Sequence, residues 1–418
     1  MKKIIKNISL LFVFILIASS VYSAVNRSIK LKIFPSEYSM EIDGKAASLQ
    51  KADKYIKRVN LTEGDHQILI KSDGYVDKTM TVTVDKTVSD LEIKLEKKDS
   101  MLQQIAVIPT GPHPKSVEFT PDGKYIVSAL LEGTGVDLFS TATFQHIKRI
   151  EFPEQYAKKR NFVEIVFIPG KNEMWVSQMA ANALHVVDMK DFSYKTTIPT
   201  LGIWTKIIAF SNDYKLAFAS NWESLDVSVI DVDQYKTIKR VKVAGIPRGM
   251  AVTSDNKFLY VCIFSTGAMQ KIDLETFKIV KTINFPKGAK RHIILDKAKN
   301  LFYVSDMYRG SIYVISPVDD KVIQEIQVDS KLNTAKLTPD GKYIFVSSRG
   351  PNNPESYLLK GPIFGKVYVI DTSNYEIKEW IWGRNQPTGL DISPDGKFMA
   401  FTNFLNNEIE LYKINYKK

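Results

Sequence analysis

One turn recurs seven times in the second part of this 418-residue chain, and its spacing limits the fold more than any other feature. Its clearest copies are residues 120–124, 338–342 and 393–397, where Ser or Thr is followed by Pro-Asp-Gly-Lys. The turn centres fall at positions 122, 170, 213, 255, 298, 340 and 395. A period of 42 or 43 residues between four of the six neighbouring pairs indicates a repeat architecture.

Each repeat carries four short apolar segments with the alternation of β-strands, one before the turn and three after it. Four antiparallel strands in about 43 residues are typical of a propeller blade, so residues 101–418 are predicted to form a seven-bladed β-propeller. The last repeat lacks its fourth strand, and residues 104–109 are predicted to supply it and close the ring. The sixth repeat carries 13 extra residues between its second and third strands, within residues 349–365.

The repeats resemble the YVTN-type seven-bladed propellers, within the wider group of quinoprotein-dehydrogenase-like and lactonase-like propellers. The resemblance is carried by residues 259–262, 302–306 and 344–348, and by the turns Pro247-Arg248-Gly249 and Pro387-Thr388-Gly389. It implies the fold but no single activity, because this architecture hosts both enzymes and binding proteins.

The N-terminus reads as a secretory signal over residues 1–24. Lys2, Lys3 and Lys6 precede an apolar run from Ile8 to Ala18, and small residues follow before position 24. The run is short for a membrane span, although a retained N-terminal anchor is the alternative. Removing three lysines lowers the formal net charge from +11 to +8. We therefore expect a periplasmic or cell-surface protein with no transmembrane segment after cleavage, and no nucleic-acid partner.

Residues 28–96 predict a separate small β-sandwich, because five or six short alternating runs are divided by turn pairs such as Asp43-Gly44 and Asp73-Gly74. The segment resembles the PEGA domain of bacterial envelope proteins, through residues 34–35, 42–44, 61–68 and 72–75. The resemblance implies contact with an envelope component or a protein partner and no chemistry of its own. Residues 97–100 would form the linker.

A candidate site follows from aligning the seven repeats at the start of the innermost strand. That position holds Lys115, Val163, Lys206, Arg248, Arg291, Asn333 and Thr388. The loops after the second strand share the same face of a propeller, and we predict that they add Asn221, Trp222, Asp306, Arg349 and Asn403. Clustered cations with amides and aromatic rings predict a mouth that binds an anionic ligand, since Arg can hold a carboxylate or phosphate through two hydrogen bonds. The alternative is that these charges are solvated or are paired with acids such as Asp306 and Glu132.

The sequence offers little support for a catalytic motif. The five histidines show no metal-ligand spacing, the chain has no Gly-x-Ser-x-Gly, and Cys262 lies in an apolar run that predicts burial. Glu118, Lys336 and Asp391 are predicted to form an ion-pair network in the channel. We therefore expect no catalytic residue, metal or cofactor, and a monomeric binding protein whose mouth takes an anionic ligand or a protein partner. Two alternatives remain: a lactonase-like hydrolase of an anionic sugar-derived lactone, and an assembly module that works through the propeller rim.

Overall fold

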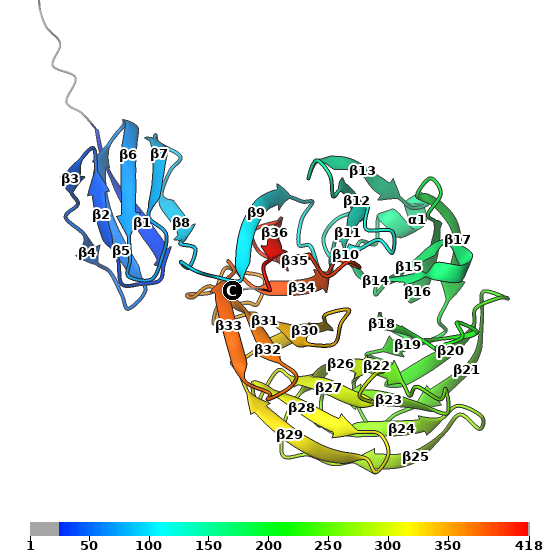
Figure 1. Cartoon of the computed structure of the whole chain (residues 1–418). Helices are drawn as coiled ribbons and strands as arrows, with labels where there is room; N and C mark the ends of the chain where they lie inside the picture. Colours follow the sequence, from blue (N-terminus) through cyan, green and yellow to red (C-terminus); the bar gives the residue numbers. More distant parts are fainter. Residues whose placement is uncertain (1–24, 417–418) are drawn as a thin grey trace, which may run out of the picture.

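The computed structural model describes residues 25–416, so the predicted signal at 1–24 lies outside the described residues. The described chain is built almost wholly of β-strands, in a small module followed by a ring of blades (Figure 1). None of its helices is long and apolar enough to cross a membrane. The all-β class and the seven-bladed propeller predicted from the repeats are confirmed.

The small module consists of two four-stranded sheets that enclose one apolar core. One sheet has the order β4 (Gln50–Lys51), β5 (Ile56–Thr62), β1 (Asn26–Phe34) and β8 (Asp90–Lys94). The other has the order β3 (Lys45–Ala46), β2 (Ser39–Ile42), β6 (Gly64–Lys71) and β7 (Lys78–Val84). Side chains that alternate along β1 and β6, such as Ile29, Leu31, Ile68 and Ile70, fill the space between the sheets and are fully buried.

Seven four-stranded sheets form the propeller, and in the first three the strands are hydrogen-bonded in chain order from the centre outward. Blade 1 has β10 (Glu118–Phe119), β11 (Tyr125–Ala129), β12 (Gly135–Ser140) and β13 (His146–Glu151). Blade 2 has β14 (Phe162–Ile168), β15 (Glu173–Gln178), β16 (Ala183–Asp188) and β17 (Ser193–Pro199), with α1 (Glu154–Ala157) before it and a 3-10 turn (Pro169–Lys171) inside it. Blade 3 has β18 (Thr205–Phe210), β19 (Leu216–Asn221), β20 (Asp226–Asp231) and β21 (Lys236–Lys242).

The later blades repeat this pattern. Blade 4 has β22 (Pro247–Val252), β23 (Phe258–Ile263), β24 (Met269–Asp273) and β25 (Lys278–Ile283). Blade 5 has β26 (Lys290–Asp296), β27 (Leu301–Asp306), β28 (Ser311–Ser316) and β29 (Lys321–Gln327). Blade 6 has β30 (Leu332–Leu337), β31 (Tyr343–Ser348), β32 (Lys366–Asp371) and β33 (Ile377–Trp382). Blade 7 has β34 (Pro387–Ile392), β35 (Phe398–Asn403) and β36 (Glu408–Ile414), with β9 (Leu102–Pro109) as its outermost strand.

The ring is held together by this last sheet, which joins the two ends of the domain. β9 runs antiparallel to β36, with Ile108 opposite Ile409 and Leu102 opposite Ile414. Because β9 leads directly into blade 1, its pairing with blade 7 ties the first and last blades together, and opening the ring would cost a full strand ladder.

The recurring turn is explained by its own hydrogen bonds. The Thr120 hydroxyl donates to the Asp122 carboxylate over 2.6 Å, and that carboxylate accepts the Lys124 N–H over 3.1 Å. Gly123 has φ +69°, which a residue without a Cβ adopts at low cost. The same Ser/Thr-to-Asp bond recurs in the turns that follow β18, β22, β30 and β34. Hydrogen bonds within the turn therefore stabilise it, and its regular recurrence marks the period of the blades.

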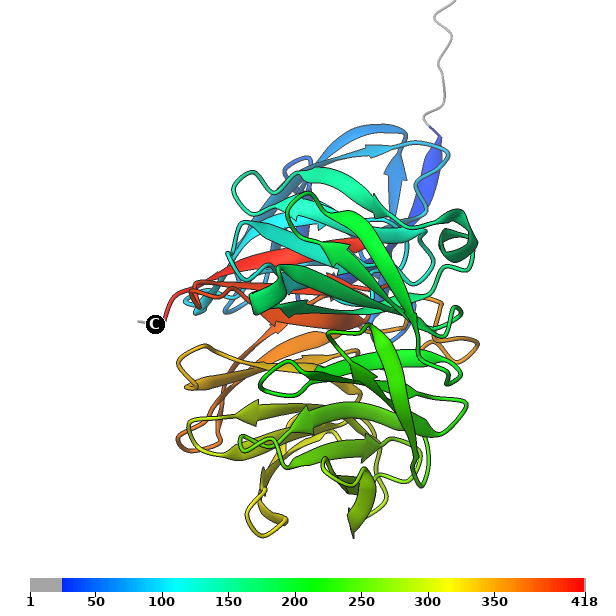
Figure 2. The same cartoon turned by 90° about the vertical axis from the view of Figure 1, so that its right-hand side faces the viewer.

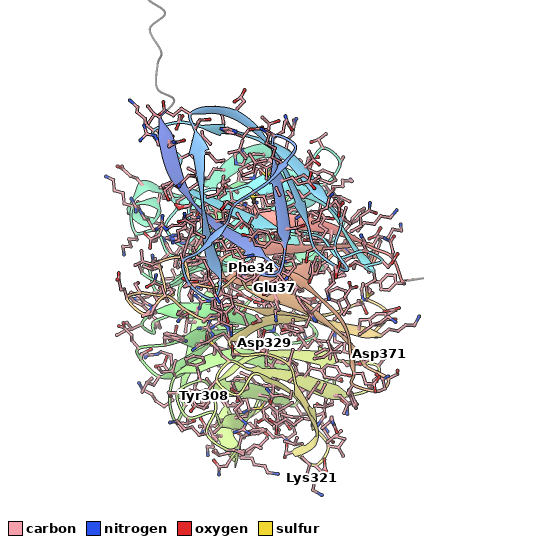
Figure 3. All side chains as sticks on the ribbon, turned by 90° about the vertical axis from the view of Figure 1, so that its left-hand side faces the viewer. Phe34, Glu37, Tyr308, Lys321, Asp329 and Asp371 are labelled. Carbon is pink, nitrogen blue, oxygen red and sulfur yellow. The ribbon has the colours of Figure 1, made fainter. Side chains whose placement is uncertain are left out.

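The small module packs against the outer side of blades 6 and 7. The Lys94 ammonium contacts the Glu410 carboxylate directly and lies 2.6 Å from the Tyr412 hydroxyl. The side chains of Lys94 and Glu410 are 7 % and 0 % exposed. Phe34 lies where the module meets the propeller (Figure 3), with its ring 4.8 Å from that of Trp382 and 4.9 Å from that of Phe364. A buried ion pair and an aromatic cluster thus connect two domains that have separate cores.

Candidate functional site

The mouth is one end of the central channel, where the loops leading into the innermost strands and the loops joining second to third strands meet. α1 belongs to this set of loops and lies on the side of the ring opposite to the C-terminus (Figure 2). The inner strands approach closely here: a Cβ on Gly249 would lie 2.9 Å from the Arg291 carbonyl oxygen. Glycine at this position allows two blades to bring their cations to the same point.

Five cations from five blades gather at the mouth: Lys115, Lys206, Arg248, Arg291 and Arg349. We call them the basic cluster. Four of them are 5–8 % exposed, and Lys115 is half-buried. Across residues 25–416, no carboxylate lies within 4.0 Å of any of the five.

The two acids that the sequence suggested as partners do not pair with the basic cluster. Asp306 pairs with Lys290 over 2.7 Å, and Glu132 lies 3.5 Å from Arg160. The interpretation that these acids compensate the mouth cations is therefore wrong for both carboxylates.

Aromatic rings and amides hold the cations instead. The Lys206 ammonium lies 3.1 Å from the centre of the Trp222 ring, and the Arg248 guanidinium lies 5.1 Å from it. Arg291 donates from Nε to the side-chain oxygen of Asn333. Such contacts orient a cation and return part of its lost hydration, but they supply no opposite charge.

Arg349 and Lys115 are held in the same way at the other side of the mouth. Arg349 donates to the side-chain oxygen of Gln386 and lies 5.7 Å from the Tyr357 ring. The Lys115 ammonium lies 4.5 Å from the Phe404 ring.

Burial lowers the pKa of every member, and repulsion between the cations lowers it further for Lys115, Lys206, Arg248 and Arg291. Loss of hydration lowers the pKa of Arg248 to about 10, with repulsion from Arg349 as the next cause. Burial also lowers the pKa of Arg349 to about 10. The pKa values of Lys115 and Lys206 fall well below their ordinary value, first by burial and then by the neighbouring arginines. The folded protein therefore pays a free-energy cost for keeping these groups charged.

Several buried polar atoms at the mouth also lack a hydrogen-bond partner. They include Nε of Arg248, Nε of Arg349, Nδ2 of Asn333 and Nε1 of Trp222. All four are N–H donors, although the Glu164 carboxylate, an acceptor, lines the same cavity as Arg248 and Asn333. A buried donor without a partner costs about 1–3 kcal/mol, and a bound acceptor would remove that cost.

Asn221 lies outside the mouth, contrary to the prediction. Its amide donates to Asp226 over 2.9 Å and to Ser228 over 2.8 Å, while its oxygen accepts the Thr205 hydroxyl over 2.8 Å. The residue ends β19 and points into its own blade, and it is fully buried.

Asp306 and Asn403 stand at the equivalent position of their blades and serve the same local purpose. Asp306 accepts N–H groups of Ala289, Tyr308 and Arg309 over 2.9 Å each, besides its pair with Lys290. Asn403 donates to Glu408 and Glu410 over 2.9 and 2.7 Å. These polar groups are satisfied inside the blades, so we remove all three residues from the candidate site.

Glu164 and His292 lie next to the basic cluster, one residue beyond the aligned position, and both line the same cavity of about 30 Å³ as Arg248 and Arg291. Burial raises the pKa of Glu164 to about 7, and burial lowers the pKa of His292 to about 3. Glu164 was not among the residues predicted from the sequence, because only the aligned position of each repeat was considered. The alternation of side chains along the strand would have placed it toward the channel.

Beyond this narrow waist the channel widens into a chamber of about 400 Å³ on the side away from the mouth. Lys336 lies 2.7 Å from Glu118 and 3.1 Å from Asp391, which also accepts the Phe119 N–H over 2.8 Å. These residues form the ion-pair network predicted from the sequence.

No group of three or more His, Cys, Asp and Glu side chains in the described part of the chain is placed to hold a metal ion. Cys262 is fully buried, and loss of hydration raises the pKa of its thiol to about 12.

These features define a seven-bladed β-propeller with an uncompensated cationic mouth and a small β-module at its side. Residues 250–418 match a family described as Lactonase, 7-bladed beta-propeller. The chain is 38 % identical over 382 residues to Antigen Lp49 of Leptospira interrogans, covering 90 % of this chain and 82 % of that protein. It belongs to the same family as Antigen Lp49.

More distant similarities agree on the fold. A 6-phosphogluconolactonase of Blochmanniella floridana is 22 % identical over 300 residues, covering 63 % of this chain and 86 % of that protein. A solved structure of Kuenenia stuttgartiensis hydrazine synthase aligns with a TM-score of 0.62 at 16 % identity, over 73 % of this chain and 97 % of that chain. At this identity the structural likeness concerns the fold alone.

Proposed function

We propose that the protein is an exported, envelope-associated binding protein whose propeller mouth binds an anionic group, a carboxylate or a phosphate. The observation that carries the proposal is the basic cluster, in which five cations converge and, in the described residues, no carboxylate lies within 4.0 Å of any of them; Glu164 lines the same cavity without forming an ion pair. The name of the relative Antigen Lp49 supports a location where antibodies can reach the protein. The small module, with its predicted PEGA-like character, would connect the propeller to the envelope.

The energetics favour a ligand over a purely structural role. Buried cations in proteins are normally paired, because an unpaired buried charge is destabilising. Here the pKa values of Arg248 and Arg349 are lowered to about 10, so keeping these two guanidinium groups charged costs free energy in the folded state. A bound carboxylate or phosphate would attract the cations and so offset the repulsion between them. Its oxygens could also accept hydrogen bonds from the N–H groups of Arg248, Arg349 and Trp222 that have no partner.

The test compares two double variants of equal charge change. Arg248→Met with Arg291→Met removes two members of the basic cluster, whereas Lys287→Met with Arg309→Met removes two exposed cations of the surrounding loops. Thermal unfolding is recorded at constant ionic strength with added phosphate or citrate. We expect both anions to raise the melting temperature of the wild type and of the Lys287/Arg309 variant, and to leave the Arg248/Arg291 variant unchanged. An equal rise in all three proteins would refute a specific site.

A second function, hydrolysis of an anionic sugar-derived lactone, is favoured by one observation. Glu164, with its pKa raised to about 7, lines the same cavity as Arg248, Arg291 and His292. A carboxylate that titrates near neutral pH can accept or donate a proton, and the arginines could hold a substrate anion. The lactonase family match and the 6-phosphogluconolactonase relatives support this alternative.

The enzymatic alternative is tested by following lactone ring opening as acid release. The substrates are 6-phosphogluconolactone and gluconolactone, each with and without calcium, and the proteins are the wild type and Glu164→Gln. Turnover above the spontaneous rate that Glu164→Gln abolishes would support catalysis. Equal rates with both proteins would exclude Glu164 as a catalytic group.

A further inference from the structure

Exposed apolar side chains lie in several loops on the same face of the propeller as the basic cluster. Leu201 and Ile203, in the loop before β18, are 61 % and 49 % exposed, and Leu225, in the loop after β19, is 39 % exposed. Tyr308, in the loop after β27, is 60 % exposed. Figure 3 shows Tyr308 on the opposite side of the ring from Asp371, which ends the third strand of blade 6.

The insertion in blade 6 completes this group. Residues 357–359, Tyr-Leu-Leu, are 39–45 % exposed in the segment between β31 and β32. Together with Leu201, Ile203, Leu225 and Tyr308 they form what we call the apolar lip. The lip draws its members from the loop between blades 2 and 3 and from loops of blades 3, 5 and 6, so it does not continue the core of one blade.

The insertion is fixed at both of its sides. Toward the mouth, Gln386 accepts from Arg349 and donates to the Tyr357 carbonyl over 2.7 Å. Toward the small module, Lys360 lies 2.7 Å from Glu92, and the Lys32 ammonium donates to the Gly361 carbonyl over 2.7 Å. The exposed side chains at 357–359 are therefore displayed by an anchored loop, and their exposure is not the result of a loose connection.

The mouth thus offers three kinds of contact: exposed apolar side chains at the lip, N–H donors without a partner on Trp222 and Asn333, and the cations of the basic cluster. A small sugar acid would use the cations and donors but would leave the apolar lip exposed. A fatty acid would use the cations and the lip but has no acceptors along its chain for the donors. A polypeptide end has a carboxylate, a carbonyl acceptor on each residue, and side chains.

We propose that the mouth binds the carboxyl-terminal end of a polypeptide whose last residues are apolar. The terminal carboxylate lies in the basic cluster, backbone carbonyls accept from Asn333 and Trp222, and the apolar side chains contact the lip. The proposal rests on the anion-binding function above and names the ligand class for the same site. Charge complementarity supports this occupant, because a terminal carboxylate carries the charge opposite to that of the five clustered cations, two of which, Arg248 and Arg291, line a cavity of about 30 Å³.

The experiment uses the full mature chain and synthetic heptapeptide pools. The first pool has five random residues followed by two drawn from Leu, Ile, Val, Phe and Tyr, with a free carboxylate. The second has the same residues with an amidated end, and the third ends in two residues drawn from Ser, Gly and Asn with a free carboxylate. Peptides retained by immobilised protein are quantified by mass spectrometry, and dissociation constants of retained peptides are measured by fluorescence anisotropy. Decanoic acid is added as a competitor arm.

Two variants test the basic cluster and the apolar lip separately. Arg248→Met removes a cation of the basic cluster, and Leu358→Ser with Leu359→Ser removes two exposed lip side chains without touching the core. We expect retention of the first pool only, with at least a tenfold loss on amidation and with Arg248→Met. The lip variant should weaken peptide binding at least fivefold while leaving phosphate and citrate stabilisation unchanged.

The outcomes distinguish this proposal from the anion-binding function. Binding of phosphate or citrate without any preference for a free apolar carboxyl terminus would overturn the peptide proposal and leave anion binding intact. Tighter binding of decanoic acid than of every peptide would overturn it in favour of a lipid acid. If no anion is bound by the wild type, both proposals fail together.

Discussion

Replacing Arg248 by methionine should make the ligand-free protein more stable, the opposite of what removal of a nearly buried side chain normally does. Arg248 is 5 % exposed and has no acid partner, and its pKa is lowered from 12.5 to about 10. At about 1.4 kcal/mol per pH unit, keeping its guanidinium charged costs the folded state about 3 kcal/mol at neutral pH. Methionine occupies much of the same space without the charge.

Part of this gain is offset by lost contacts. The guanidinium lies 5.1 Å from the Trp222 ring and 5.6 Å from the Phe264 ring, and such contacts are worth about 1 kcal/mol. The net gain in the free energy of unfolding is therefore about 2 kcal/mol. The sign follows from linkage: a base whose pKa falls on folding destabilises at every pH below the folded value, so the whole effect is present at pH 7.

The assay is urea unfolding followed by tryptophan fluorescence, in a buffer without phosphate or polycarboxylates that would occupy the mouth. Urea is uncharged and does not screen the cluster. Lys290→Met is the matched control, because Lys290 is fully buried in the neighbouring blade but pairs with Asp306 over 2.7 Å. Its loss should destabilise by about 3–5 kcal/mol. A loss of stability in Arg248→Met as well would show that the protein itself compensates Arg248, and the argument for a ligand would fail.

Three further predictions concern the waist, the domain contact and the inner strands. The free energy of unfolding of the wild type, compared with that of Glu164→Gln, should fall by about 3 kcal/mol as the pH rises from about 4.5 to about 7. The reason is that Glu164 keeps its proton in the folded state and releases it in the unfolded state. Parallel pH profiles of the two proteins would contradict this. Lys94→Met should leave Glu410 buried without its partner and cost about 3–5 kcal/mol, and adding Glu410→Gln should recover part of the loss; small-angle scattering reports whether the module also separates from the propeller. Gly249→Ala should lower the urea midpoint, since its Cβ would lie 2.9 Å from a backbone oxygen of the next blade, whereas Gly170→Ala, with open space around its Cβ, should not.

The repeat period fixed the propeller from local chemistry that can be read directly. The Ser/Thr-Pro-Asp-Gly turn makes its hydrogen bonds within five residues, so its positions mark the blades without any tertiary information. The alignment of the repeats then identified Lys115, Lys206, Arg248 and Arg291 as equivalent residues, and the structure brings these four together with Arg349.

The same alignment failed for Asn221, Asp306 and Asn403 because it locates a residue along a blade and does not say where its side chain points. At the end of the second strand a short polar side chain can bond the adjoining turn or the next strand of its own blade, and all three do so. Glu164 was missed for the converse reason. Its channel-facing direction follows from the strand, but its importance follows from the burial that only the closed ring creates.

The sequence by itself determined the number of blades and the identity of the cations at the mouth, since both depend on interactions or spacings within a single repeat. Only the tertiary structure decided that no carboxylate of the described residues lies within 4.0 Å of these cations, that Glu164 and His292 line the same cavity, and that the blade 6 insertion is held between Arg349 and the small module. The physical reason is that charge compensation is a property of distances between blades. Each repeat contributes only a few side chains to the channel, and which charges meet there depends on ring closure and not on neighbours in the chain.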